Sequence, residues 1–96
     1  MDSQKAREQK KITAQRLRQL LEKQQYRCFF TGRRLDPETT SVDHMLPVSR
    51  GGCHTIDNVC IAHMDVNRAK GTLTVDEFIE MCREVVEWSE RYKFDD

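Results

Sequence analysis

The sequence predicts a small domain of the α+β class. A short extended run at 41–45 and an apolar, β-branched run at 56–62 are separated by a loop that contains Ser-Arg-Gly-Gly, and helical patterns lie on both sides of them. The chain has 96 residues, of which 38% are hydrophobic and 33% charged, so it can form one domain with a modest core. We expect two antiparallel strands, a short helix after them, and one flanking helix at each end.

The N-terminal part is predicted to be a basic helix. Residues 1–9 are polar and without periodicity, so we expect them to be flexible. A helical pattern covers about residues 6–25, and its clearest part is the basic stretch 10–25. Its apolar residues fall close to one face: Ile12, Leu17, Leu20 and Leu21. This stripe is narrow and predicts packing along one edge, which leaves cations such as Arg16 and Lys23 able to lie along a phosphate backbone.

Residues 26–40 break the helical pattern and are predicted to form turns. Gly32 suits a tight turn, and the Asp-Pro-Glu sequence that begins at Asp36 is also turn chemistry. We expect Phe29 and Phe30 to belong to the core, because a turn that exposed both rings would be unfavourable.

The middle of the chain is predicted to form a hairpin followed by a helix. Ser41–Met45 is the first expected strand, and Pro47 ends it because proline cannot donate to a sheet ladder. Ile56–Ala62 is the second strand, antiparallel to the first. His63–Lys70 then suits a short helix, and Gly71 suits the position just after its end.

The C-terminal segment 74–93 is predicted to be a helix of about residues 75–92. Thr74 and Glu77 have the spacing of a capping box at its start. Apolar or small residues follow at helical spacing on one face: Phe78, Cys82, Val85, Val86, Ser89 and Tyr92. This pattern predicts a helix that serves as structural scaffold.

Charge is distributed unevenly along a chain whose net charge is zero. Residues 1–34 carry ten Lys/Arg against three acids, a net charge of +7, and residues 71–96 carry three against eight, a net charge of −5. A basic front half suits a polyanionic partner. The other interpretation is a solvated helix face that pairs with the acidic C-terminal helix, and charge alone leaves both open.

Composition argues against a membrane protein and against disulfides. No window approaches the roughly 20 apolar residues of a membrane span, and the polar N-terminus does not resemble a secretory signal. We therefore expect a cytoplasmic protein. The four cysteines form no CxxC pair, so disulfides are not expected in this setting.

The segment 41–71 carries the residues best suited to chemistry. Asp43 is a hard oxygen ligand for a divalent cation, and Asn67 can add an amide oxygen to the same shell. His44 can take a proton from water. It follows Asp43 directly, so the strand must end or bend for both to act at one site. Each residue alone has a plainer explanation, such as a strand end or a polar helix surface, and it is their combination that indicates chemistry on a phosphate.

The order of these residues resembles a known motif. Asp43-His44 is followed by Asn58 fourteen residues after the histidine, then by Asn67 and an Arg-x-Lys-Gly sequence. This run resembles the HNH endonuclease motif of the ββα-metal (His-Me finger) superfamily, with spacing similar to the HNH domain of RNA-guided CRISPR nucleases. The segment Cys28–Gly32 resembles the one before the motif in small phage and restriction-type HNH proteins. The resemblance covers roughly residues 20–72.

The resemblance implies a fold and an activity. The fold is a ββα-metal core of hairpin and short helix at residues 41–71, flanked by helices, in a single HNH nuclease domain over residues 1–96. The activity is hydrolysis of DNA phosphodiester bonds with one divalent cation, Mg²⁺ or Mn²⁺, leaving 5′-phosphate and 3′-hydroxyl ends. The DNA is expected to be double-stranded and read with weak sequence preference. A phage packaging or restriction partner is compatible with it, and the oligomeric state is open.

The resemblance also assigns roles to individual residues. His44 would be the general base, and Asn58 would orient the loop that holds it. Asp43 and Asn67 would bind the metal ion. Contacts with nucleic acid are expected of five cations: Lys70, Arg68, Arg50, Arg16 and Lys23.

The chain departs from the family pattern at the zinc site that many relatives carry. Its positions correspond here to Cys28, Thr31, His63 and Val66, and only the Cys and the His could ligate, so no structural zinc is expected. Two other interpretations stay open. One is a non-catalytic nucleic-acid-binding module of the same fold. The other is a structural zinc-binding interaction module that uses some of five residues: Cys28, Cys53, His54, Cys60 and His63.

Overall fold

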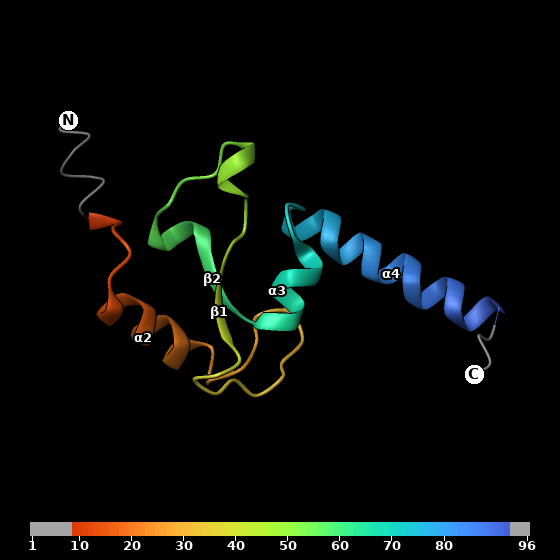
Figure 1. Ribbon diagram of the computed structural model, residues 1–96, viewed down its shortest axis with the longest axis horizontal. Helices are drawn as coiled ribbons and strands as arrows, with labels where there is room; N and C mark the ends of the chain where they lie inside the picture. The colour runs from red at the N-terminus through yellow and green to blue at the C-terminus, as the bar shows by residue number, and fades with distance from the viewer. Residues whose placement is uncertain (1–8, 93–96) are drawn as a thin grey trace.

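The computed structural model describes residues 9–92 and shows a hairpin with three α-helices in that range (Figure 1). The elements are α2 (Ala14–Lys23), β1 (Thr40–His44), β2 (Val59–His63), α3 (Met64–Lys70) and α4 (Val75–Tyr92), with 3-10 helices at Val48–Arg50 and Ile56–Asn58. The predicted α+β class is confirmed. The predicted flexibility of residues 1–9 lies outside the described residues, except at its last position.

The hairpin is antiparallel, with His44 of β1 opposite Val59 of β2. The run Val59–Ala62 of β2 is buried. The outer edge of β2 is closed by a side chain rather than by a third strand. The amide of Gln24, just after α2, accepts a hydrogen bond from the Ile61 N–H (3.0 Å) and donates one to the Ile61 carbonyl (2.8 Å). This pairing satisfies the edge of the sheet and fixes α2 beside it.

Two elements start later than the sequence predicts. The helix predicted over about residues 6–25 is α2, which begins at Ala14 because Thr13 caps it by accepting the Arg16 N–H at 3.1 Å. Residues 6–8 of that prediction lie outside the described residues. The second strand begins at Val59, since Ile56–Asn58 forms a 3-10 turn first. In both places the chain forms a local hydrogen-bonded cap or turn. The apolar pattern alone would assign those residues to the helix or strand that follows.

The core lies where α2, β2, α3 and the start of α4 meet. Its buried members are Cys28, Leu35, Ile61, Ala62, Val66 and Phe78, and Leu20, Leu21, Phe30 and Leu73 pack against them. Phe30 meets Phe78 edge-to-face at a centroid distance of 5.4 Å. Phe29 is 49% exposed, so the prediction that both phenylalanines belong to the core is wrong for Phe29.

The last helix starts as predicted but packs over only its first turn. Thr74 and Glu77 form the capping box. The Glu77 nitrogen lies 3.2 Å from the Thr74 hydroxyl oxygen, and the Thr74 nitrogen lies 2.9 Å from the Glu77 carboxylate. Phe78 is buried, whereas Val85 and Tyr92 farther along are 62% and 57% exposed. Figure 1 shows α4 projecting away from the hairpin.

The predicted helix is present, but its apolar face beyond Phe78 is largely exposed. The reason is length. α4 has 18 residues and α3, the helix it starts against, has seven. At about 1.5 Å per residue, α4 extends well past the surface that α3 can offer.

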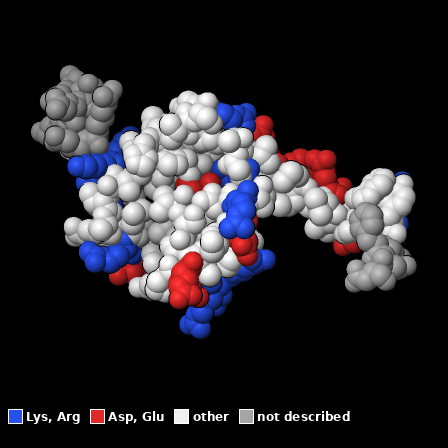
Figure 2. Space-filling view, in the orientation of Figure 1, with Lys and Arg blue, Asp and Glu red and all other residues white. Residues whose placement is uncertain are grey.

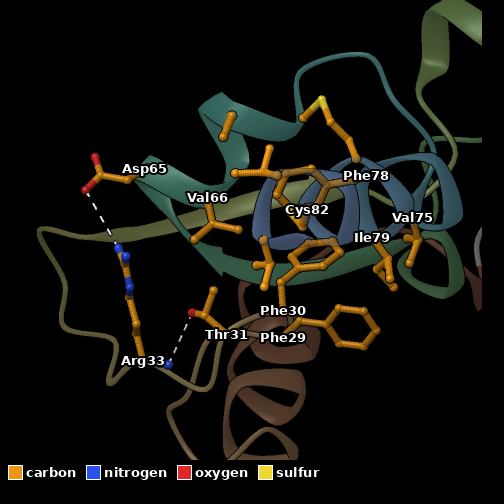
Figure 3. Close-up of a pocket in the computed structure, with 14 residues that line it drawn as sticks. Phe29, Phe30, Thr31, Arg33, Asp65, Val66, Val75, Phe78, Ile79 and Cys82 are labelled. Carbon is orange, nitrogen blue, oxygen red and sulfur yellow. Dashed lines mark hydrogen bonds and ion pairs between the residues drawn. The ribbon is translucent and has the colours of Figure 1, made fainter. Parts of the chain in front are cut away.

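The projection of α4 leaves an apolar groove of about 860 Å³ between that helix and the body of the domain. Figure 3 shows Phe29 and Phe30 on one side of it and Ile79 and Cys82 of α4 on the other. An exposed ion pair between Arg33 and Asp65 (4.0 Å) lies at its rim. None of the residues predicted to carry chemistry lines this groove.

The basic and acidic helices lie on opposite sides of the hairpin. Acidic side chains follow α4 in Figure 2, while many of the basic ones lie on the side of α2 and below the hairpin. No ion pair within residues 9–92 joins α2 to α4. The interpretation in which the basic helix pairs with the acidic one is therefore wrong. None of the described helices combines the length and the apolar character that a membrane crossing requires.

Candidate active site

The candidate site is built at the end of β1. Asp43 is 4% exposed, whereas its neighbour His44 is only half-buried. Successive strand residues point to opposite faces, and here the strand ends at His44, as a shared site requires. The Asp43 side chain faces α3, and the His44 ring meets the loop between the strands.

The carboxylate of Asp43 is neutralised by a buried lysine. The ammonium of Lys70 lies 3.3 and 3.2 Å from its two oxygens and also donates to the His44 carbonyl at 3.1 Å. Lys70 is 1% exposed. The sequence interpretation put this lysine on a phosphate, and the structure instead buries it against Asp43, because the last turn of α3 packs directly on β1.

The same buried cluster contains a thiol. Cys60, opposite Asp43 in the hairpin, has its sulfur 3.8 Å from the carboxylate. Burial, reinforced by the negative charge of Asp43, raises the pKa of the Cys60 thiol to about 12. The thiol therefore stays protonated at neutral pH and acts as a weak donor to Asp43.

Asn67 lies over the same face of β1 as Asp43. Its Nδ2 donates to the Ser41 hydroxyl at 2.6 Å and to the Val42 carbonyl at 3.3 Å. Ser41 and Asp43 are two residues apart and so share a face of the strand, and Asn67 and Lys70 are one turn apart on α3. The helix thus holds Asn67 at Ser41 and Val42, over the same strand face that carries Asp43.

Asn58 ties together the loop that follows His44. Its Oδ1 accepts from the Leu46 N–H (3.0 Å), and its Nδ2 donates to the carbonyls of Leu46 and Cys53 (2.9 Å each). This is the bridging contact expected from the sequence, although Asn58 lies in the 3-10 turn rather than in the strand. One amide therefore fixes both ends of the loop.

His54 is a residue of the site that sequence reasoning missed. Its Nδ1 lies 2.8 Å from Nε2 of His44. The signal was present, since a histidine in the loop that connects the two strands can reach the end of the first. Sequence reasoning considered His54 only as a candidate zinc ligand.

Of the other cations predicted to contact nucleic acid, two bind groups of the protein and two are exposed. Arg50 pairs with Glu77 and donates to the Thr72 carbonyl (3.3 Å), so it links the loop to the start of α4. Arg16 donates to the Lys11 carbonyl at 2.6 Å. Two cations are exposed and are available to a polyanion: Lys23 and Arg68.

The four positions that correspond to the family's zinc site come together around Cys28. Burial acts to raise the pKa of the Cys28 thiol, but hydrogen bonds with Thr31 and with the His63 backbone outweigh it and lower this pKa below its ordinary value. The His63 side chain caps α3 by accepting the Asp65 N–H at 3.1 Å. Val66 packs in the core beside Cys28. These contacts give the four positions packing and capping roles.

Asp43 and Asn67 carry donor atoms of the kind that a hard divalent cation binds. Asp43 and Asn67 offer carboxylate and amide oxygens, which Mg²⁺ and Mn²⁺ accept. Within residues 9–92 the Asn67 Oδ1 accepts no hydrogen bond, and each oxygen of Asp43 keeps lone pairs beyond those that Lys70 uses. A bound cation would share the Asp43 carboxylate with Lys70, which lowers its affinity.

The described residues contain no group of three or more His, Cys, Asp or Glu side chains that could hold a metal ion. A site made by one carboxylate and one amide is of a different kind, since its second donor is an asparagine. No model of a known protein family matches the chain, and no curated protein matches its sequence.

Proposed function

We propose that the protein is a metal-dependent DNA endonuclease of the HNH type. It would hydrolyse phosphodiester bonds with His44 as the general base and leave 5′-phosphate and 3′-hydroxyl ends. The observation that supports the proposal is the packing of α3 on β1, where Lys70 binds Asp43 and Asn67 binds Ser41 on the same strand face. These residues are far apart in sequence, and a core would not require this combination.

The proposal gives each residue a role that is compatible with its contacts. His44 takes a proton from the attacking water, whose oxygen bonds to phosphorus as the bond to the 3′ oxygen breaks. Asn58 holds the loop beside His44, and Lys70 pairs with the buried Asp43 carboxylate and orients it. A divalent cation held by Asp43 and Asn67 would supply Lewis-acid stabilisation of the charge on the phosphate and the leaving oxygen.

The proposed partner is double-stranded DNA bound with weak sequence preference. Arg18 and Lys23 of α2 are exposed, and α2 lies on the opposite side of the hairpin from α4 (Figure 1). Arg68 is exposed one residue after Asn67. Such cations recognise phosphates rather than bases. The salt dependence of binding should therefore be steep.

One observation favours a second candidate, a nucleic-acid-binding module of the same fold that does not cleave. The Asp43 carboxylate already has a buried counter-ion in Lys70. Such a pair is satisfied without a metal, so the cluster could serve stability alone. The two candidates differ in whether the chain cuts DNA when a divalent cation is supplied.

A plasmid assay tests the proposal. Supercoiled DNA is incubated with the purified chain and Mg²⁺ or Mn²⁺, or with a chelator, beside the variant His44→Ala. We expect nicking only with the cation and a rate at least about 10²-fold lower in His44→Ala, the usual contribution of a general base, with DNA affinity retained. Equal nicking by both proteins would refute the role of His44, and affinity without any cleavage would support the binding module.

A further inference from the structure

The ring of His44 is paired with a second imidazole that the proposed mechanism does not yet use. Nε2 of His44 and Nδ1 of His54 are 2.8 Å apart, with ring centroids at 5.0 Å. A hydrogen bond between two neutral imidazoles needs one N–H donor and one lone-pair acceptor. The contact therefore couples the tautomers of the two rings, because one of the two facing nitrogens must carry a proton and the other must not.

The loop between the strands is built to hold His54 in this place. Gly52 packs so closely on the exit of β1 that a Cβ atom there would lie 1.8 Å from the Leu46 carbonyl oxygen. Asn58 donates both to that carbonyl and to the carbonyl of Cys53, the residue before His54. A close backbone approach and a shared amide thus fix the position of the second histidine.

Only one of the two possible arrangements leaves a base. If His54 donates the hydrogen bond, the Nε2 lone pair of His44 is occupied and the neutral His44 ring carries its proton on Nδ1, so neither nitrogen can accept. If His44 donates from Nε2, its Nδ1 keeps a free lone pair. In the described part of the chain, Nδ1 of His44 makes no hydrogen bond.

We propose that His54 is a positioning residue that holds His44 in the Nε2–H tautomer, so that Nδ1 is the nitrogen that takes the proton from water. This inference rests on the proposed function, because it takes His44 as the base. After the transfer, the His44 imidazolium still donates from Nε2 to His54. That hydrogen bond becomes charge-assisted and so strengthens as the reaction proceeds.

The tautomer can be tested without any activity. Ring ¹⁵N shifts of neutral His44, assigned with the His44→Ala variant, report which nitrogen is protonated. We expect a protonated Nε2 and an unprotonated Nδ1 in the unaltered chain, and a shift toward a mixture of tautomers in His54→Phe. A proton on Nδ1, or shifts that His54→Phe leaves unchanged, would overturn the inference.

A kinetic comparison separates positioning from folding. His54→Asn keeps an acceptor near the place of Nδ1, His54→Phe keeps a ring without one, and Cys53→Ser is the control, an exposed neighbour in the same loop. We expect single-turnover nicking to fall at least about tenfold in His54→Phe, to recover in part in His54→Asn and to persist in Cys53→Ser, with DNA affinity unchanged throughout. Equal rates in His54→Phe and the unaltered chain, or equal losses in both His54 variants, would overturn it.

The two proposals fail in different ways. If the unaltered chain does not nick DNA with any divalent cation, the proposed function fails, and the ring shifts still decide the tautomer. If the unaltered chain nicks and His54→Phe nicks equally fast, the endonuclease proposal stands and the role of His54 fails.

Discussion

The ammonium of Lys70 lies 3.2 Å from the nearer oxygen of Asp43, and both side chains are buried. The two residues are 27 positions apart and join the last turn of α3 to the end of β1. Removing one partner of a buried ion pair leaves an uncompensated charge, whereas removing both can be nearly neutral. The pair therefore has consequences for stability that can be separated from its proposed part in catalysis.

The first prediction concerns this pair. Lys70→Met should lower the free energy of unfolding by about 3–5 kcal/mol, because it leaves the Asp43 carboxylate buried alone. The double variant Asp43→Leu/Lys70→Met should be more stable than Lys70→Met and should not nick DNA, since it lacks the carboxylate. Urea denaturation and plasmid nicking measure the two effects. A double variant less stable than the single one would contradict this account of the pair.

The second prediction concerns α4. Phe78→Ala should cost about 3 kcal/mol of unfolding free energy, because the ring is buried against Phe30. Val85→Ala should change it by no more than about 0.5 kcal/mol, because Val85 is 62% exposed. The two variants are compared by urea denaturation at equal protein concentration. A large loss in Val85→Ala would show that this face of the helix is covered in solution.

The third prediction concerns pH. The hydrogen bond from Arg50, assisted by the Thr74 backbone, lowers the pKa of Glu77 from 4.5 to about 2. Because the folded-state pKa is the lower one, the contribution of Glu77 to stability is present above about pH 4.5 and is lost as the pH falls toward 2. Both side chains are exposed, so we expect a small effect.

The measurement is the urea midpoint of the unaltered chain minus that of Glu77→Gln, followed from pH 7 to pH 2. The difference should shrink within that acid window. Glu84→Gln, which removes a charge from the same helix without touching Arg50, is the control. A difference that stays constant down to pH 2 would show that the Arg50 contact does not favour the ionised carboxylate.

The fourth prediction concerns DNA binding. Lys23→Ala should reduce the slope of log affinity against log salt by about 0.9, the value for one phosphate contact on duplex DNA. Arg91→Ala on the acidic helix is the matched control and should leave the slope unchanged. Fluorescence anisotropy over a salt series measures both. Equal slopes in Lys23→Ala and the unaltered chain would show that α2 does not lie along the backbone.

The elements that the sequence predicts well are those specified by neighbouring residues. The capping box of Thr74 and Glu77, the end of α3 at Gly71 and the two strands around the loop all appear in the structure. Each depends on local hydrogen bonds or on a period that can be counted along the chain. The hydrogen bonds of Asn58 to the loop are also predicted well, because the backbone groups of the adjacent loop are the nearest partners for its side-chain amide.

The features that the sequence does not predict depend on contacts between residues that are far apart in the chain. The burial of Lys70 follows from how closely α3 packs on β1, and a lysine in an Arg-x-Lys-Gly run gives no sign of it. The exposed face of α4 depends on the size of the body beside it, while its apolar pattern is that of a packed helix. The pairing of His54 with His44 requires the path of the loop, which Gly52 and Asn58 set together.

The central claim of the proposed function is that Asp43 and Asn67 share a cation while His44 takes a proton from the attacking water. Its most direct test is plasmid nicking in Mg²⁺ or Mn²⁺ by the unaltered chain, by Asn67→Ala and by the exposed α4 control Arg83→Ala. We predict cation-dependent nicking by the unaltered chain and by Arg83→Ala, and a loss of at least about tenfold in Asn67→Ala that added cation partly restores. No nicking by the unaltered chain with either cation, or nicking by Asn67→Ala at the same rate as the unaltered chain, would contradict the claim.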